Sequence, residues 1–331
     1  MNGRVLVGDI GGTHARFAIV DTSASPWQIK NADDIAADLP DFSSALRVYL
    51  DRAGFAVRPD AIALAVAGPI TDGAASLTNR KWRITEDDLR ALGFKDALLL
   101  NDFAALAFAV TTLGPSDFHT IGPKIPGIEG EPISILGAGT GFGASILARF
   151  HGRAIAVATE GGHAGFAPRD DSEVAVLQIL ARRFEHVSIE RVLSGPGLEN
   201  LHQALAELSG RKAESIAAAE IVGRSAVDTD CRDAVRMFCA IYGTVAGDFA
   251  LSHGARGGVY LAGGIAQKIE KILEQSQFRA RFENKGRLSS YVKSIPTRLI
   301  LDSNVAFFGA ARASLEFRSS NSGSTLHGQQ R

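Results

Sequence analysis

The order of hydrophobic and polar residues predicts strands that run into glycine-rich turns near the start of the chain. The stretch VLVGDIGGTHARFAIVD, residues 5–21, begins as an apolar strand, reaches Gly11, Gly12 and Thr13, and continues in Ala15–Asp21. That last segment alternates and is rich in β-branched and aromatic residues, so it predicts a second strand rather than a helix. The glycines are therefore expected at the tip of a hairpin.

Such a hairpin tip suits phosphate. Its backbone N–H groups form a small concavity for phosphate oxygens, and Thr13 adds a hydroxyl donor. Asp9, at the end of the first strand, would instead hold Mg²⁺ directly or through water. A dinucleotide-binding turn requires a helix after the glycines, and the P-loop string G-x-x-x-x-G-K-[ST] does not occur. An ordinary glycine-rich hairpin with a solvated aspartate is the alternative that this stretch leaves open.

The same pattern returns in ISILGAGTGFGASILARF, residues 133–150. An apolar strand meets Gly137, Gly139, Thr140 and Gly141, and another apolar strand follows. Two strand–turn–strand units predict a duplicated architecture, in which facing hairpins could hold a triphosphate from both sides.

A third glycine site lies in GGVYLAGGIAQKI, residues 257–269. A strand passes through Gly263 and Gly264 into a helical pattern. A helix that begins with bare backbone suits the face of a base or a ribose, although a plain strand-to-helix turn has the same pattern.

Polar residues interrupt apolar segments at two further places. In ALLLNDFAALAFAV, residues 97–110, Asn101 and Asp102 lie where a buried strand gives way to a helical pattern. An aspartate there is either a helix cap or a functional carboxylate. In EGGH, Glu160 and His163 approach each other on glycine-rich backbone, and a carboxylate can accept hydrogen bonds from two neighbouring hydroxyls.

Composition narrows the class of protein. At 331 residues the chain is long enough for about two domains. A net charge of −1 gives no reason to expect nucleic acid or an anionic membrane as a partner. The two cysteines, Cys231 and Cys239, exclude a disulfide framework or a cysteine-rich zinc site, and we expect both in the core. The longest apolar stretch, residues 97–110, is interrupted by polar residues, so no membrane span and no leader is predicted.

The combined motifs resemble those of the bacterial glucokinases of the hexokinase type, within the actin/hexokinase/heat-shock ATPase superfold. The absence of a cysteine-rich zinc motif after EGGH separates the chain from the repressor-type sugar kinases. The resemblance spans nearly the whole chain. It rests on VGDIGGTHARFAIVD (7–21), AVAGPI (65–70), LLLNDFAA (98–105), GAGTGFG (137–143), EGGHAGFAP (160–168), RVLSGPGL (191–198) and LAGGIA (261–266).

The resemblance implies an α/β fold of two ribonuclease-H-like domains with a central cleft. We expect a small domain at 2–112 plus a returning helix in 304–317, a large domain at 113–303, and a disordered polar tail at 318–331. It also implies phosphorylation of D-glucose at O6 by ATP with Mg²⁺, giving ADP and glucose 6-phosphate, the first step of glycolysis. A cytoplasmic homodimer is expected from the same resemblance.

The resemblance assigns roles to individual residues. Asp102 would act as general base on the sugar hydroxyl. The sugar would contact Asn79, Asn101, Asp102, Glu160, His163 and Glu190, of which Glu190 carries no signal of its own. ATP would contact Gly8, Asp9, Ile10, Gly11, Gly12, Thr13, Gly137, Gly139, Thr140, Gly141, Gly263 and Gly264.

Two alternatives to glucose phosphorylation stay open at this point. A kinase for another hexose or amino sugar would use the same fold, because selectivity depends on a few hydroxyl contacts. A non-catalytic, actin-like nucleotide switch would hydrolyse ATP slowly and without regard to sugar. That second alternative leaves the pair Asn101 and Asp102 and the EGGH segment unexplained.

Overall fold

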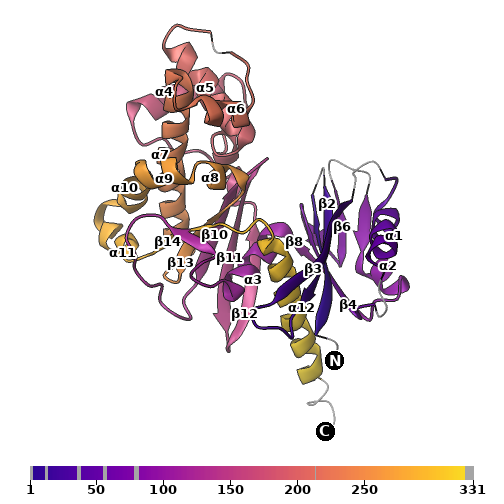
Figure 1. The fold of residues 1–331 in the computed structure, drawn as a ribbon. Helices are drawn as coiled ribbons and strands as arrows, with labels where there is room; N and C mark the ends of the chain where they lie inside the picture. Colours follow the sequence, from indigo (N-terminus) through magenta and orange to yellow (C-terminus); the bar gives the residue numbers. More distant parts are fainter. Residues whose placement is uncertain are drawn as a thin grey trace. The chain divides into compact units, whose positions relative to one another are not determined.

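The computed structural model describes residues 3–11, 14–35, 39–54, 58–77, 82–212 and 214–324, with side chains through Arg318. Its contacts divide the chain into two compact units (Figure 1). The first unit holds residues 1–113, 150–156 and 303–331, and the second holds 114–149 and 157–302. Residues 150–156 thus group with the first unit, whereas the sequence analysis assigned them to the larger domain.

The first unit contains a five-stranded sheet with the order β3-β2-β1-β4-β8. β1 pairs antiparallel with β2 and parallel with β4, and β4 pairs parallel with β8. The predicted strand over 15–21 is confirmed as β2. The strands are β1 (Arg4–Ile10), β2 (Ala15–Asp21), β3 (Gln28–Ile35), β4 (Ala61–Val66) and β8 (Asp96–Asn101), and a small second sheet holds β5 (Ile70–Thr71), β6 (Ala74–Ser76) and β7 (Arg83–Thr85).

A six-stranded sheet with the order β12-β11-β10-β13-β14-β9 repeats this topology, and apart from residues 150–156 it belongs to the second unit. In this sheet β10 corresponds to β1. It pairs antiparallel with β11, which follows its glycine turn, and parallel with β13. The predicted duplication is therefore confirmed at the level of strand order. The strands are β9 (Phe118–Thr120), β10 (Ile133–Ala138), β11 (Phe142–Phe150), β12 (Arg153–Thr159), β13 (Gly258–Ala262) and β14 (Thr297–Ile300).

Helices cover both faces of the first sheet (Figure 1). α1 (Phe42–Ala53) and α2 (Glu86–Ala91) pack on one face, while α3 (Asp102–Ala109) and α12 (Val305–Ser324) pack on the other. α12 approaches α3 closely, because a Cβ at Gly309 would lie 1.9 Å from the Ala105 carbonyl oxygen. The sequence predicted this returning helix in 304–317 and a disordered tail from 318; the helix instead continues to Ser324.

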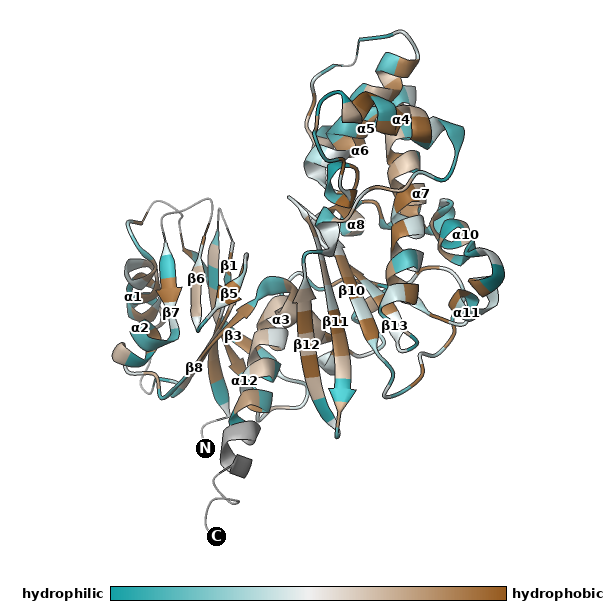
Figure 2. Ribbon diagram, turned by 180° about the vertical axis from the view of Figure 1, so that it is seen from behind, coloured by the Kyte–Doolittle hydropathy of each residue, from teal (hydrophilic) through white to brown (hydrophobic). Residues whose placement is uncertain are grey.

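The core of the second unit is built around α7 (Thr229–Ser252), the longest of the described helices. Hydrophobic residues line α7 and the strands β10, β11 and β13, whereas the outer helices carry both hydrophobic and hydrophilic residues (Figure 2). Cys231 and Cys239 are fully buried on α7, as expected. The other helices are α4 (Asp171–Ala181), α5 (Gly195–Leu208), α6 (Ala218–Arg224), α8 (Gly264–Lys268), α9 (Glu270–Gln275), α10 (Phe278–Glu283) and α11 (Ser289–Lys293), with single 3₁₀ turns at Val110–Thr112, Gly161–His163, Ile189–Arg191 and Gly286–Leu288.

One correction to the sequence analysis concerns membrane spans. Within the described residues, α7 is long and apolar enough to cross a bilayer by length and composition alone. However, 67% of its apolar window is buried inside the structure, as in the core helix of a folded unit.

Candidate active site

The first glycine turn joins β1 to β2, as the alternating pattern predicted. The Gly11 N–H donates to the His14 carbonyl oxygen at 2.9 Å and closes the turn; Gly12 and Thr13 lie outside the described residues. Two of the predicted ATP contacts lie in the core of this strand. A Cβ at Gly8 would lie 2.6 Å from Leu64 Cδ2 on the neighbouring β4, and the Ile10 side chain is fully buried. Only the backbone of these two residues could meet a ligand, and their contact with ATP stays a prediction.

Asp9 lies beside this turn, in an open depression of about 390 Å³. Its carboxylate forms an ion pair with Arg16, which lies directly opposite in the β1–β2 register. His14 Nδ1 lies 2.9 Å from a carboxylate oxygen of Asp34 at the same depression. The described residues hold no cluster of three or more metal-ligating side chains. Asp9 therefore fits Mg²⁺ as a single carboxylate ligand, the usual arrangement when phosphates and water complete the coordination.

The second glycine turn joins β10 to β11 in a similar way. The Gly139 N–H donates to the Gly141 carbonyl oxygen at 2.8 Å, so this amide is already used. Gly137 is buried in β10 opposite Gly143, which makes it a strand position rather than a ligand contact. Thr140 is exposed at the tip. Thr140 and Gly141 are thus the members of the predicted set that remain available to phosphate oxygens.

The third glycine site packs directly against the second turn. Gly263 has φ = 93°, and a Cβ there would lie 2.3 Å from the Ala138 carbonyl oxygen at the end of β10. The position therefore requires glycine for both conformation and space. Gly264 begins α8, which has no side-chain cap, so its first amides are bare, as the sequence predicted.

Asn101 and Asp102 lie at the predicted strand-to-helix junction, but the cap is Asn101. Its Oδ1 accepts from the N–H groups of Phe103 and Ala104 at 2.9 and 3.2 Å. Its Nδ2 donates to the Gly68 carbonyl oxygen at 3.1 Å. Asp102 is the first helical residue and is half-buried. Asn101 thus fixes the start of α3 and keeps one Nδ2–H that these contacts do not use. The catalytic role of Asp102 and the sugar contact of Asn101 stay predictions.

The EGGH segment forms a single 3₁₀ turn after β12, with the Glu160 and His163 side chains exposed. Both glycines are packing positions. A Cβ at Gly162 would lie 2.0 Å from the Phe142 carbonyl oxygen, and one at Gly161 would lie 2.6 Å from the Phe249 ring. The segment therefore lies directly against the start of β11.

Residues 186–190 run beside this segment and bring Glu190 to the same place. The Phe166 N–H donates to the Val187 carbonyl oxygen at 2.9 Å, and the Ile189 N–H donates to that of Ala164 at 2.8 Å. The His186 Nε2–H donates to the His163 carbonyl oxygen at 2.8 Å, which assigns the proton to that nitrogen. Glu190, which had no sequence signal of its own, is half-buried at the end of this pairing.

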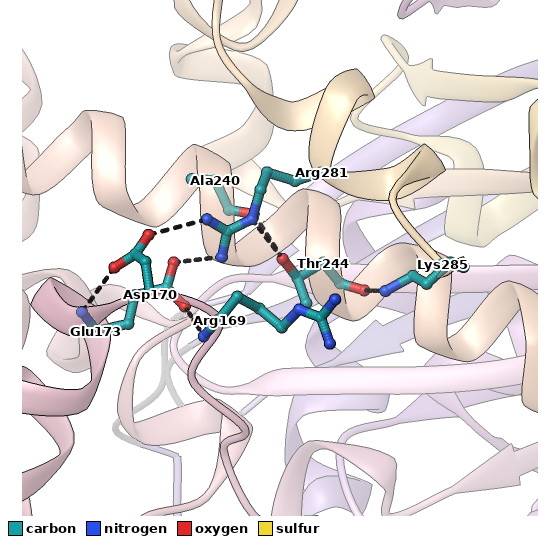
Figure 3. Close-up of polar contacts among 7 residues, drawn as sticks. All are labelled: Arg169, Asp170, Glu173, Ala240, Thr244, Arg281 and Lys285. Carbon is teal, nitrogen blue, oxygen red and sulfur yellow. Dashed lines mark hydrogen bonds and ion pairs between the residues drawn. The ribbon is translucent and has the colours of Figure 1, made fainter. Parts of the chain in front are cut away.

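A largely buried charge cluster holds the far end of the loop 160–168 (Figure 3). We use the name buried charge cluster for the buried Glu173, Arg281 and Lys285 together with Thr244 and the exposed Asp170. Glu173 is 1% exposed, accepts from the Arg169 N–H at 2.8 Å and forms an ion pair with Arg281. Arg281 also donates to Thr244 Oγ1 at 3.0 Å and to Asp170 at 3.1 Å.

Electrostatics within the cluster follow from these contacts. The pKa of Asp170 lies below its ordinary value because the Glu173 N–H, and then Arg281, donate to its carboxylate. Burial lowers the pKa of Lys285, against the opposing effect of its hydrogen bond to Asp248. The cluster fixes Arg169, the residue that follows the loop, because the Arg169 backbone N–H donates to the Glu173 carboxylate.

The structure thus assembles the predicted residues in two separate sets. The first unit carries Asp9, Gly11, Asn101 and Asp102; Asn79 lies outside the described residues. The second unit brings the EGGH segment, Glu190 and Gly263 together around one glycine turn, Ala138–Phe142. Sequence reasoning did not predict that Ser194 and Gly195 hold this turn, and the dense glycine of SGPG was their only local signal.

The duplicated sheet and the glycine turns at the ends of its first strands define a kinase of the actin-like ATPase/hexokinase superfold. Comparison with known proteins agrees with this class. The family model described as glucokinase matches residues 6–316. A glucokinase of Caulobacter sp. (strain K31) is 48% identical over 311 residues, covering 93% of this chain and 94% of that protein.

Solved structures give the same result. The glucokinase from an Antarctic psychrotroph superimposes with a TM-score of 0.87 at 34% identity, covering 95% of this chain and 99% of that one. A glucokinase of the ROK family from Streptomyces griseus, solved with glucose and AMPPNP, shares the fold alone, with a TM-score of 0.65 at 18% identity over 94% of this chain and 99% of that one. The chain belongs to the glucokinase family.

Proposed function

We propose that this enzyme transfers the γ-phosphoryl group of ATP to O6 of D-glucose, giving glucose 6-phosphate and ADP. The observation that carries the proposal is the packing of the EGGH segment, Glu190 and Gly263 around a single glycine turn. This arrangement offers sugar-binding carboxylates and bare backbone amides at one strand end. The glucokinase relatives, and the glucose and AMPPNP bound in the Streptomyces griseus structure, support the choice of substrates.

Asp102 is the proposed general base. Its carboxylate would take the proton from the sugar O6 while that oxygen attacks the γ-phosphorus. Asn101 positions it by capping α3. Glu160, His163 and Glu190 would bind the other sugar hydroxyls.

The glycine turns would bind the phosphates. The Thr140 and Gly141 amides, the Thr140 hydroxyl and the backbone near Gly11 would stabilise negative charge on the transferring group. Asp9 would hold Mg²⁺, which neutralises charge on the β- and γ-phosphates when it is bound. Gly263 and Gly264 would accommodate the nucleoside. We further propose a cytoplasmic homodimer, as the family resemblance implies.

The test is glucose-dependent ADP formation in a coupled assay. Asp102→Ala should lower turnover by about 10²- to 10⁴-fold, because general base catalysis contributes a factor of that size. Asp96→Ala is the matched control, since Asp96 begins the strand β8 that leads to Asp102 and pairs with Arg318 instead. Near-normal turnover by Asp102→Ala would remove Asp102 from its role. ADP formation that ignores sugar in the unmodified protein would favour the nucleotide-switch alternative.

A further inference from the structure

The Glu190 carboxylate lies against the backbone of the second glycine turn. Its Oε2 accepts from the Phe142 N–H at 2.8 Å. A Cβ at Gly141 would lie 2.4 Å from the same oxygen, so the carboxylate fills the space that a side chain would need. The side chain predicted to contact the sugar is therefore in direct contact with the turn predicted to contact phosphate.

A second contact with this turn comes from the segment that follows Glu190. The Gly195 N–H donates to the Gly139 carbonyl oxygen at 2.8 Å. Ser194, which is 1% exposed, donates through Oγ to the Glu190 carbonyl oxygen at 2.7 Å and accepts from the Gly197 N–H at 2.9 Å. The start of α5 thus fixes the backbone of Glu190, and the glycine turn is held from both of its sides.

The Phe142 hydrogen bond uses one of two carboxylate oxygens. An ionised carboxylate can accept from further donors, including a sugar hydroxyl, through its other oxygen. A hydroxyl bound there would restrict the Glu190 side chain further and, through Phe142, the tip formed by Gly139–Gly141.

We propose that Glu190 is a positioning residue for the nucleotide as well as a sugar ligand, and that it couples the two binding events. The coupling half of this proposal rests on the proposed function, whereas the positioning half does not. Because linkage is reciprocal, sugar that tightens nucleotide binding through Glu190 must itself be bound more tightly when nucleotide is present.

Calorimetry with AMPPNP and Mg²⁺, first without sugar, tests the positioning role. Glu190→Ala should weaken AMPPNP binding about tenfold, as expected for one lost hydrogen bond to a charged group. Glu190→Gln should bind AMPPNP with an affinity close to that of the unmodified protein, because the amide oxygen of the glutamine can still accept from the Phe142 N–H. A purely electrostatic role predicts the opposite sign, since removing a negative charge near phosphate would tighten binding in both variants.

Glu199→Ala is the matched control. Glu199 also accepts from a backbone amide in the second unit, that of Ala218 at 3.0 Å, and it has no part in the glycine turn. It should leave AMPPNP binding unchanged. If it weakens binding as much as Glu190→Ala does, general loosening is the explanation and the proposal is wrong. Unchanged or tighter binding by Glu190→Ala overturns it as well.

A second perturbation works from the opposite side of the contact. Gly141→Ala should weaken sugar-free AMPPNP binding by crowding Glu190, and unchanged binding would count against the proposal even if Glu190→Ala fails to fold. In the double variant Gly141→Ala with Glu190→Ala, the carboxylate oxygen that the new Cβ would crowd is absent. The loss of AMPPNP affinity in the double variant should therefore be smaller than the sum of the two single losses. Repeating the titrations with saturating glucose measures the coupling, which is the ratio of the AMPPNP dissociation constants without and with glucose. In Glu190→Ala this ratio should fall toward one. Absence of any glucose binding by the unmodified protein would instead refute the proposed function.

Discussion

Replacing Arg281 with methionine would test whether one guanidinium holds the buried charge cluster. Arg281 is 13% exposed at its side chain, and its partner Glu173 is 2% exposed. Methionine conserves much of the buried volume, so the change mainly removes charge and hydrogen bonds. Glu173 would then be buried with the Arg169 N–H as its main remaining partner.

The expected cost follows from this burial. Breaking a buried ion pair by removing one partner costs about 3–5 kcal/mol. We therefore expect a loss of about 3–5 kcal/mol at pH 7, which is a large share of the stability of a typical domain.

Urea unfolding at pH 7 measures the deficit. The double variant Glu173→Gln with Arg281→Met should recover much of the loss, because it removes the unpaired charge. Steady-state kinetics supply a functional readout: a loosened Arg169 should raise KM for glucose more than it changes kcat. A deficit below about 1 kcal/mol, or a double variant that recovers none of the loss, would refute this account of the cluster.

Two further outcomes are expected. Glu160→Gln should weaken glucose binding more than AMPPNP binding in calorimetry, because its exposed carboxylate belongs to the sugar set, and equal losses would contradict that assignment. Asp170→Asn should flatten the decline of stability below about pH 4, measured by acid titration of urea unfolding. The lowered pKa of Asp170 means that its contribution is complete above the unfolded-state pKa and is lost as pH falls, and asparagine retains the helix cap without the charge. An unchanged acid limb would show that this ionisation is not coupled to folding.

The sequence by itself determined the features that depend on near neighbours in the chain. Alternation over 15–21 predicted β2, and glycine spacing predicted both hairpin turns, because strand pairing across a tight turn is local. The repeat of that pattern predicted the duplicated sheet.

Only the tertiary structure decided which polar residue caps α3 and which partners the buried carboxylates have. Asn101 and Asp102 are adjacent, and the assignment of the cap to Asn101 depends on Gly68, which a different strand end supplies. Glu190 acquires its environment from Phe142, and Glu173 from Arg281, partners far away in the chain. Periodicity describes spacing within one element, whereas a hydrogen bond between elements depends on how sheets and helices pack, and no short stretch of sequence carries that information.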